Sequence, residues 1–267
     1  MRLHHLNCGS MRPITPTRAG LPTAPVVNHC LLAETDDGLV LVETGLGLGD
    51  VRDPSGSLDA DWVAMVEPAL AAGETAVRQI ERLGYAPADV RHVLVTHLDV
   101  DHCGGLPDFP DAAVHVLETE LDAALREAPS RRYRPAHWAH GPQWTTYGPA
   151  NDKWFGLDAI QPKGLPEAFK LVPLAGHSAG HTGVAVHNGD RWLLHCGDAY
   201  YYHRELDENP EPHPVLDVVQ TRSEVDHGER VGSQAALRTL ARDHAAEVTL
   251  FSAHDPWEFD RLSRPMG

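Results

Sequence analysis

The sequence predicts an α/β protein in which helices are layered on sheets and a functional site lies at one edge of those sheets. Two observations carry this prediction. Apolar runs typical of strands occur in both halves of the chain, and each half also contains segments with helical periodicity. In addition, three of the expected strands end in polar, chemistry-bearing side chains, at His97, Asp198 and His254. Ligand sites of layered α/β proteins commonly lie at such strand ends.

The N-terminal half is expected to alternate strands with helices. Its first two apolar runs flank the turn sequence Asp36-Asp37-Gly38, which predicts a hairpin. Continuous apolar runs predict buried strands, and apolar side chains at helical spacing predict helices. The expected strands of this half are 26–33, 39–43, 89–97 and 111–118, and the expected helices are 74–83 and 118–128.

The segment 129–166 differs from the rest because it is rich in proline, glycine and aromatic residues. We interpret it as an ordered insertion without regular elements, packed over a single domain that spans 1–267. Its aromatic side chains are Tyr133, Trp138, Trp144, Tyr147, Trp154 and Phe155. Most should pack the insertion onto the body, and one or two should line a pocket for an apolar or ring-bearing ligand.

The C-terminal half is predicted to return to strands. The segment 169–200 contains several apolar runs, with a turn at Asn188-Gly189-Asp190. A helix is expected over 229–244. A last strand, within 247–255, ends beside His254.

Composition narrows the classes of partner. The formal net charge is −16, which disfavours nucleic acid, and the single arginine cluster at 131–134 is short. No apolar run approaches the roughly 20 residues of a membrane span, and no signal peptide is read at the start. We therefore expect a cytoplasmic protein with a small-molecule substrate, without a membrane or nucleic-acid partner; its oligomeric state is unknown. The four cysteines are scattered, which favours buried thiols over disulfides.

Four potential metal ligands lie within six residues, directly after an expected buried strand: His97, Asp99, Asp101 and His102. His97 and Asp99 are two apart and can face one ion, whereas Asp101 and His102 are adjacent and can be aimed at a second. Two ions about 3.5–4 Å apart can clamp a scissile carbonyl or phosphoryl group. The glycines at 104–105 allow the backbone to turn tightly after the run. The chain also holds 18 histidines, the commonest metal-binding side chain.

Further motifs follow in the order typical of one family. They are "LVETG" at 41–45, "THLDVDH" at 96–102, "AGHSAGHTGV" at 175–184, "LLHCGDAYY" at 193–201 and "FSAHDPWEF" at 251–259. With this ordered set the chain resembles the metallo-β-lactamase-fold hydrolases over most of its length, and its lactonase-like branch in particular. The resemblance implies a four-layer αββα sandwich. Asp99 stands where the second histidine of the HxHxDH signature is usual.

The same resemblance implies seven ligands for two divalent metal ions. They are His97, Asp99 and His177 for one ion, Asp101, His102 and His254 for the other, and Asp198 as a bridge between them. His181 matches a family position that usually does not bind metal, so its expected role is structural. Glu43 replaces an aspartate of the family turn and is expected to support that turn or the ligands.

Asp99 bears on the identity of the metal. A glutamate occupies the corresponding position in the flavodiiron branch, so a carboxylate there is compatible with two ions. Because Asp99 replaces a neutral imidazole with an anion, we expect it to shift the preference from zinc towards iron or manganese. Zinc is the first expectation, with iron and manganese as alternatives. In a second interpretation, Asp99 faces solvent and the first ion is bound weakly or not at all.

The expected reaction is hydrolysis of a small-molecule ester, lactone or amide by metal-bound hydroxide, with Asp101 accepting a proton. Tyr201 resembles a tyrosine of the quorum-quenching lactonases and can hydrogen-bond the developing oxyanion. The segment "GHSAG" at 176–180 has the GxSxG spacing of serine hydrolases, but it lies within the family motif, and we interpret Ser178 as a turn residue. The alternatives left open are a di-iron redox enzyme of the flavodiiron-like type and a non-catalytic metal-binding protein.

Overall fold

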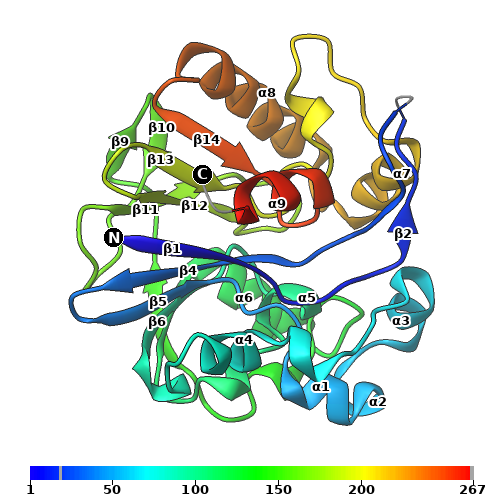
Figure 1. Cartoon of the computed structure of the whole chain (residues 1–267), viewed down its shortest axis with the longest axis vertical. Helices are drawn as coiled ribbons and strands as arrows, with labels where there is room; N and C mark the ends of the chain where they lie inside the picture. The colour runs from blue at the N-terminus through cyan, green and yellow to red at the C-terminus, as the bar shows by residue number, and fades with distance from the viewer. Residues whose placement is uncertain (18–19, 265–267) are drawn as a thin grey trace.

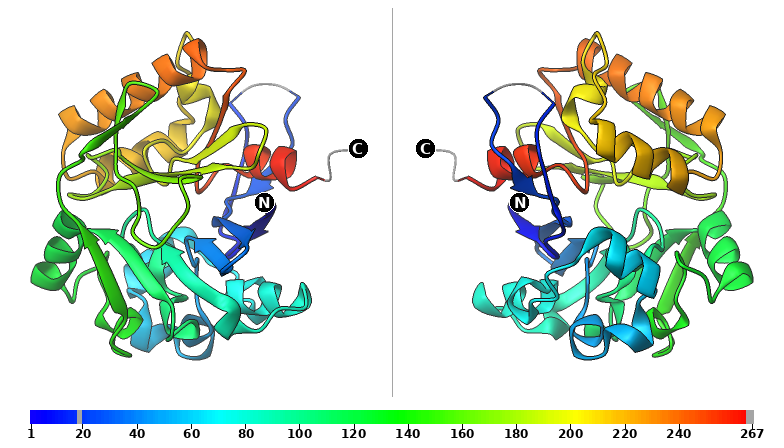
Figure 2. Two further views of the ribbon diagram at one scale, coloured as in Figure 1. Left: turned by 90° about the vertical axis from the view of Figure 1, so that its left-hand side faces the viewer. Right: turned by 90° about the vertical axis from the view of Figure 1, so that its right-hand side faces the viewer.

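The computed structural model describes residues 1–17 and 20–264, and its two sheets lie face to face between outer layers of helices (Figure 1). The N-terminal half builds one sheet and its helices, and the C-terminal half builds the other (Figure 2). This arrangement confirms the predicted four-layer αββα sandwich. Within the described ranges, no helix is both long and apolar enough to cross a membrane.

The larger sheet has six strands in the order β1-β4-β5-β6-β7-β8. Its strands are β1 (Arg2–Asn7), β4 (His29–Thr35), β5 (Gly38–Val42), β6 (Val90–Leu94), β7 (Ala113–Leu117) and β8 (Gln143–Tyr147). The pairs β1–β4 and β4–β5 are antiparallel, and β5 through β8 are parallel. The predicted hairpin is confirmed, since β4 and β5 join at the turn after Thr35.

The smaller main sheet has four strands in the order β11-β12-β13-β14. They are β11 (Phe169–Pro173), β12 (Thr182–His187), β13 (Trp192–His195) and β14 (Val248–Phe251). The first three are antiparallel, and β14 runs parallel to β13. Two short hairpins complete the strands: β2 (Pro13–Ile14) with β3 (Ala24–Pro25), and β9 (Asp152–Trp154) with β10 (Leu157–Ala159).

Helices lie on the outer faces of the two sheets and around their edges (Figure 1). They are α1 (Leu48–Arg52), α2 (Pro54–Ser57), α3 (Ala60–Val66), α4 (Ala76–Arg82), α5 (Val100–Cys103), α6 (Glu118–Glu127), α7 (Pro214–Ser223), α8 (His227–Asp243) and α9 (Pro256–Ser263). Short 3-10 turns lie at Ala72–Glu74, Pro87–Asp89, Leu106–Asp108, Pro135–His137 and His203–Leu206. The predicted helices correspond to α4, α6 and α8, with ends that differ by two residues or fewer.

Three of the four apolar clusters among the described residues hold the four layers together. The inner core lies between the sheets, where Leu31 and Val42 of the larger sheet pack with Phe169 and Phe251 of the smaller one. One outer core joins the larger sheet to α4 and α6. The other joins the smaller sheet to α8, through residues such as Leu237. Each sheet is therefore buried on both faces, which explains why its strands read as continuous apolar runs.

The segment 129–166 is ordered, but the prediction that it lacks regular elements was wrong. It contributes β8 to the parallel edge of the larger sheet and contains the β9–β10 hairpin, which reaches β11 through the bridge between Ile160 and Leu171. Tyr133, Tyr147 and Trp154 are buried, so these aromatic residues pack onto the body as expected. Because proline and glycine are signals of loops, the short strands between these residues could not be recognised from the sequence.

Candidate metal centre

The seven predicted ligands meet where the loops that follow or connect the strands converge. The run from His97 follows β6, and Asp198 follows β13. His254 follows β14, whereas His177 lies in the loop between β11 and β12. Because these loops come from both sheets, the centre lies where the edges of the two sheets meet, as the sequence predicted.

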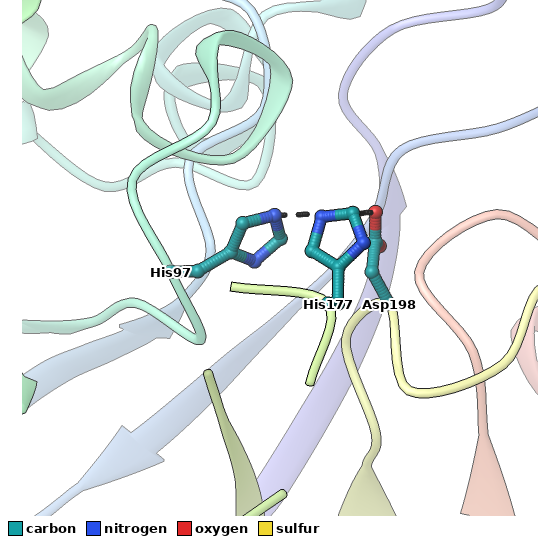
Figure 3. Close-up of side chains that lie close together, drawn as sticks. All are labelled: His97, His177 and Asp198. Atoms are coloured by element: carbon teal, nitrogen blue, oxygen red, sulfur yellow. Dashed lines mark ion pairs between the residues drawn. The ribbon is translucent and has the colours of Figure 1, made fainter. Parts of the chain in front are cut away.

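Asp198 directs its two carboxylate oxygens at two different groups of side chains. Oδ2 lies 3.9 Å from His97 Nε2 and 3.5 Å from His177 Nε2, and Figure 3 shows these three side chains converging. Oδ1 lies 3.3 Å from His102 Nε2 and 3.1 Å from His254 Nε2. This is the arrangement that a carboxylate bridging two cations would have.

The two groups fit metal ions by their spacing. His97, His177 and Asp198 offer ligand atoms within 4.8 Å of one another, and so do the second group's residues. That second group consists of Asp101, His102 and His254. The buried atoms His97 Nε2, His102 Nε2 and Asp198 Oδ1 have no hydrogen-bond partner among the described residues. Buried polar atoms are rarely left unpaired, so a cation at each group would satisfy them.

Hydrogen bonds at Nδ1 leave Nε2 available on three of the histidines. His102 Nδ1 lies 2.5 Å from Glu43 Oε2, His254 Nδ1 lies 2.9 Å from the carbonyl oxygen of Val27, and His97 Nδ1 lies 2.9 Å from Thr96 Oγ1. For His102 and His254 these partners are acceptors, so the proton belongs on Nδ1 and the lone pair on Nε2.

Glu43 contacts a histidine of this centre but does not belong to either group of ligands, in agreement with the supporting role expected for it. Its backbone has a φ of 63°, in the left-handed region, within the turn that follows β5. One carboxylate oxygen accepts from His102, and the other accepts from the backbone N–H of Thr96. Glu43 thereby links β5 to the ligand run.

His181 has no nitrogen free for a metal, which agrees with the structural role predicted for it. Its Nδ1 lies 2.8 Å from the carbonyl oxygen of Leu174, and its Nε2 accepts from the backbone N–H of Asp198 at 2.9 Å. Gly197 makes this contact feasible, because its φ is 53° and a Cβ there would lie 2.5 Å from His181 Nε2. His181 therefore holds the backbone of the bridging residue.

Asp99 lies beside the first group but shares its carboxylate with an arginine. Oδ2 is 3.2 Å from His177 Nε2 and 3.5 Å from His97 Nε2, while Oδ1 is 3.3 Å from Arg132 Nε. The side chain is only 15% exposed, so the interpretation in which Asp99 simply faces solvent was wrong. The tight three-residue set of the first group does not include Asp99.

The electrostatics of the centre favour positive charge. Burial would raise the pKa of Asp198, but His254 and His102 outweigh it and hold that pKa well below its usual range. Burial would likewise lower the pKa of His102, but Asp198 and Glu43 raise it well above normal. For His97, burial and repulsion from His102 lower the pKa well below normal. The carboxylates therefore create a place for cations in a buried setting.

A cavity of about 410 Å³ opens onto the centre and is lined by Asp99, Asp101, Asp198, Tyr201 and His254. Its walls are largely apolar and come from the β2–β3 hairpin, α3 and α7. The apolar lining residues include Met11, Ile14, Val26, Trp62, Met65, Val66, Leu216 and Val219.

The aromatic residues of 129–166 do not line this cavity within the described part of the chain, so that expectation was wrong. The segment contributes Ser130, Arg131 and Arg132 instead. Its aromatic side chains contact other parts of the protein instead. For example, the Tyr133 hydroxyl donates to Glu120, and the Tyr147 hydroxyl contacts His115. Tyr201 is 5% exposed, and its hydroxyl donates to Asp198 Oδ2 at 2.9 Å.

The sequence model of the metallo-beta-lactamase superfamily matches residues 23–249, in agreement with the motifs and with this geometry. The chain belongs to the metallo-beta-lactamase superfamily. A probable metallo-hydrolase of Mycobacterium tuberculosis is 41% identical over 261 residues, which cover 96% of this chain and 81% of that protein. The N-acyl homoserine lactonase AttM of Agrobacterium fabrum is 29% identical over 227 residues, which cover 82% of this chain and 78% of that protein.

Solved structures of the superfamily share the fold. An N-acyl homoserine lactone hydrolase, with N-hexanoyl-L-homoserine bound at its catalytic metal centre, matches with a TM-score of 0.74 at 20% identity, over 99% of this chain and 96% of that one. Together with the relatives, this shows that the protein is a metal-dependent hydrolase. The redox and non-catalytic alternatives that the sequence left open find no support among these relatives.

Two residues that contact the centre's loops were missed from the sequence. Arg132 was noted only as part of a basic cluster, and Glu120 only as part of a helix. Both reach the centre through contacts between residues far apart in the chain: Arg132 pairs with Asp99, and Glu120 accepts from the backbone of Leu98. No local pattern marks such contacts. The signal that the sequence offered for Glu120 is its position four residues before Ala124, which places a carboxylate on the apolar face of the expected helix.

Proposed function

We propose that the protein hydrolyses a lactone or ester that carries an apolar chain, using two divalent metal ions, of which zinc is the first candidate. The observation that carries this proposal is the bridging geometry of Asp198 at the end of an apolar cavity. The naming of AttM as an N-acyl homoserine lactonase supports the same substrate class. A small molecule of that class would place its carbonyl at the centre and its chain along the walls.

The residues that would hold the ions are His97, His177, Asp99 and Asp198 on one side, and Asp101, His102, His254 and Asp198 on the other. When bound, divalent ions polarise a carbonyl and make a coordinated water more acidic. Asp101 lies at the cavity wall, where its carboxylate can accept the proton of the attacking water.

Tyr201 is the residue placed to assist the carbonyl oxygen. It lines the cavity beside Asp198, and its hydroxyl is a hydrogen-bond donor at 2.9 Å from Oδ2. Burial, with Asp198 nearby, raises the pKa of Tyr201 well above normal, so the phenol keeps its proton at neutral pH. A protonated phenol can donate to an oxyanion as negative charge develops.

The first test is metal quantification followed by a panel of lactones, esters and thioesters on the same sample. We expect about two ions per chain and the highest kcat/KM on lactones or esters with an apolar acyl chain. Fewer than about 1.5 ions per chain, with no gain after incubation with zinc, manganese or iron, would contradict the two-ion site. Full metal content without turnover on any of these substrates would contradict the substrate class alone.

The second test is Tyr201→Phe. We expect kcat to fall roughly a hundredfold, as for loss of one oxyanion donor, while metal content stays unchanged. Tyr202→Phe is the matched control, because Tyr202 is an adjacent buried tyrosine whose hydroxyl contacts Thr17. Unchanged kcat in the Tyr201 variant would remove this hydroxyl from the mechanism.

A further inference from the structure

Asp99 and Arg132 form an ion pair beside the first metal group. Asp99 presents Oδ2 to His97 and His177 and presents Oδ1 to Arg132 Nε at 3.3 Å. The two side chains are 15% and 17% exposed, so their charges are weakly screened by solvent. The carboxylate thus faces the metal group with one oxygen and a fixed cation with the other.

Arg132 is held in place by the protein. Its Nη1 donates to the carbonyl oxygen of His177 at 3.1 Å, and its Nη2 donates to the carbonyl oxygen of Ser223. Each of its three nitrogens therefore has a protein partner. Although Arg132 lines the cavity, these contacts leave it poorly suited to binding a substrate.

The positive charge of the Arg132 guanidinium offsets one of the negative charges around the two metal groups. Three carboxylates face the two metal groups, those of Asp99, Asp101 and Asp198. Three carboxylates and one guanidinium carry the same net charge as two carboxylates with a neutral imidazole. Without Asp99, a buried guanidinium beside two cations would destabilise the site. Without Arg132, the site would carry one more negative charge than a site with a neutral histidine at position 99.

We propose that Arg132 is a positioning and charge-balancing residue whose ion pair with Asp99 makes this carboxylate the electrostatic equivalent of a neutral ligand for the first metal ion. This inference rests on the two-ion site of the proposed function. It replaces the expectation from sequence that Asp99, as an anion in place of a neutral imidazole, shifts the preference from zinc towards iron or manganese. The pair therefore keeps the centre suited to the ions that a histidine in this position would favour.

The test is a double-mutant cycle with Asp99→His, Arg132→Gln and the double variant, measured as the rise in Tm on adding Zn²⁺ to metal-free protein. The Arg132→Gln variant leaves the Asp99 charge unbalanced, so its metal-free Tm should fall and its zinc-induced rise should exceed that of the wild type. The Asp99→His variant leaves a buried cation beside the ions, so its zinc-induced rise should shrink and its first-ion affinity should drop at least about tenfold. The double variant should return to near the wild-type values.

Matched variants keep this test decisive. Arg131→Gln is the control, because Arg131 is an exposed neighbour without an ion pair among residues 1–17 and 20–264. Arg132→Lys keeps the charge and should retain wild-type zinc affinity. If Asp99→His does not fold, Asp99→Asn with and without Arg132→Gln gives the same comparison.

Two results would overturn the proposal. If both single variants shrink the zinc-induced rise and the double variant adds their losses, Arg132 only supports the loop. If Asp99→His alone keeps both ions at wild-type affinity, the pair has no balancing role. A wild-type protein that binds no zinc, manganese or iron would instead count against the two-ion site itself, so the two failures are distinguishable.

Discussion

At the scale of single residues, the atom that each histidine offers to the centre is set by what its other nitrogen contacts. His102 is the clearest case, because Glu43 Oε2 accepts a hydrogen bond from Nδ1–H while Nε2 remains without a hydrogen-bond partner in the described residues. Glu43 also fixes the start of the ligand run through the backbone of Thr96. One carboxylate therefore sets both the tautomer and the position of a ligand.

Replacing Glu43 by glutamine should weaken binding of the second ion by about 10- to 100-fold, as is usual for loss of a carboxylate behind a metal-binding histidine. Zinc affinity is measured by competition with a chelator. Glu34→Gln is the control, because Glu34 also contacts a histidine, His4 at 2.6 Å, but on the far part of the same sheet. Equal zinc affinity in the Glu43 and Glu34 variants would show that the contact with His102 has no effect.

The residues of the centre were predictable to the extent that they stand in short motifs. His97 to His102 form a dense run, and Asp198 and His254 follow apolar strands, so the sequence carries their roles locally. Arg132 contacts Asp99 from 33 positions away, in a segment that reads as irregular, and only the folded chain brings them together.

At the scale of elements, α6 connects two of the loops that carry the first metal group, those of His97 and His177. Its Glu120 is completely buried and accepts four hydrogen bonds. The donors are the backbone N–H of Leu98 and the hydroxyl of Tyr133 at 3.0 Å on Oε1, and the Ser178 hydroxyl at 2.6 Å and the Gly180 N–H at 3.0 Å on Oε2. A helix of the outer layer thereby fixes loops from both sheets.

Glu120→Gln should lower the free energy of unfolding by about 3 kcal/mol, because one acceptor becomes an NH₂ group that faces buried donors. Urea denaturation of metal-free protein measures this change. Glu118→Gln, at an exposed position of the same helix, should change stability by less than about 0.5 kcal/mol. A loss below about 1 kcal/mol for Glu120→Gln would mean that the four contacts contribute little.

The elements with strong periodicity were predictable, and the shorter ones were not. The hairpin of β4 and β5 and the helices α4, α6 and α8 follow from apolar spacing. In contrast, β8 contains the partly exposed sequence "QWTTY" and lies at the edge of its sheet, so it lacks the buried run that marks central strands. The short helices α1 to α3 gain their stability from tertiary packing, which no local window contains.

At the scale of the whole molecule, several histidines are buried in the layers away from the centre. His115 of β7 is 1% exposed and lies between His92 Nδ1, at 2.9 Å, and the hydroxyl of Tyr147, at 2.6 Å. Burial, with repulsion from His92, lowers the pKa of His115 to about 4. Burial likewise lowers the pKa of His5 to about 4, with His195 adding to the effect. The folded protein keeps these imidazoles neutral where an unfolded chain would bind protons.

Acid should therefore destabilise the fold, and His115 provides the test. A histidine titrates near pH 6.5 when unfolded, so the stability linked to its lowered pKa is complete above that pH and is lost as the pH falls from 6.5 towards 4. Each such histidine can contribute a slope of up to about 1.4 kcal/mol per pH unit, or about 3 kcal/mol over this range. In metal-free His115→Gln, the free energy of unfolding should vary less steeply with pH than in metal-free wild type. The offset between the two proteins at pH 8 reports lost packing and hydrogen bonds, whereas the difference in slope below pH 6.5 reports the missing proton. Parallel curves over the whole range would show that folding leaves the pKa of His115 unchanged.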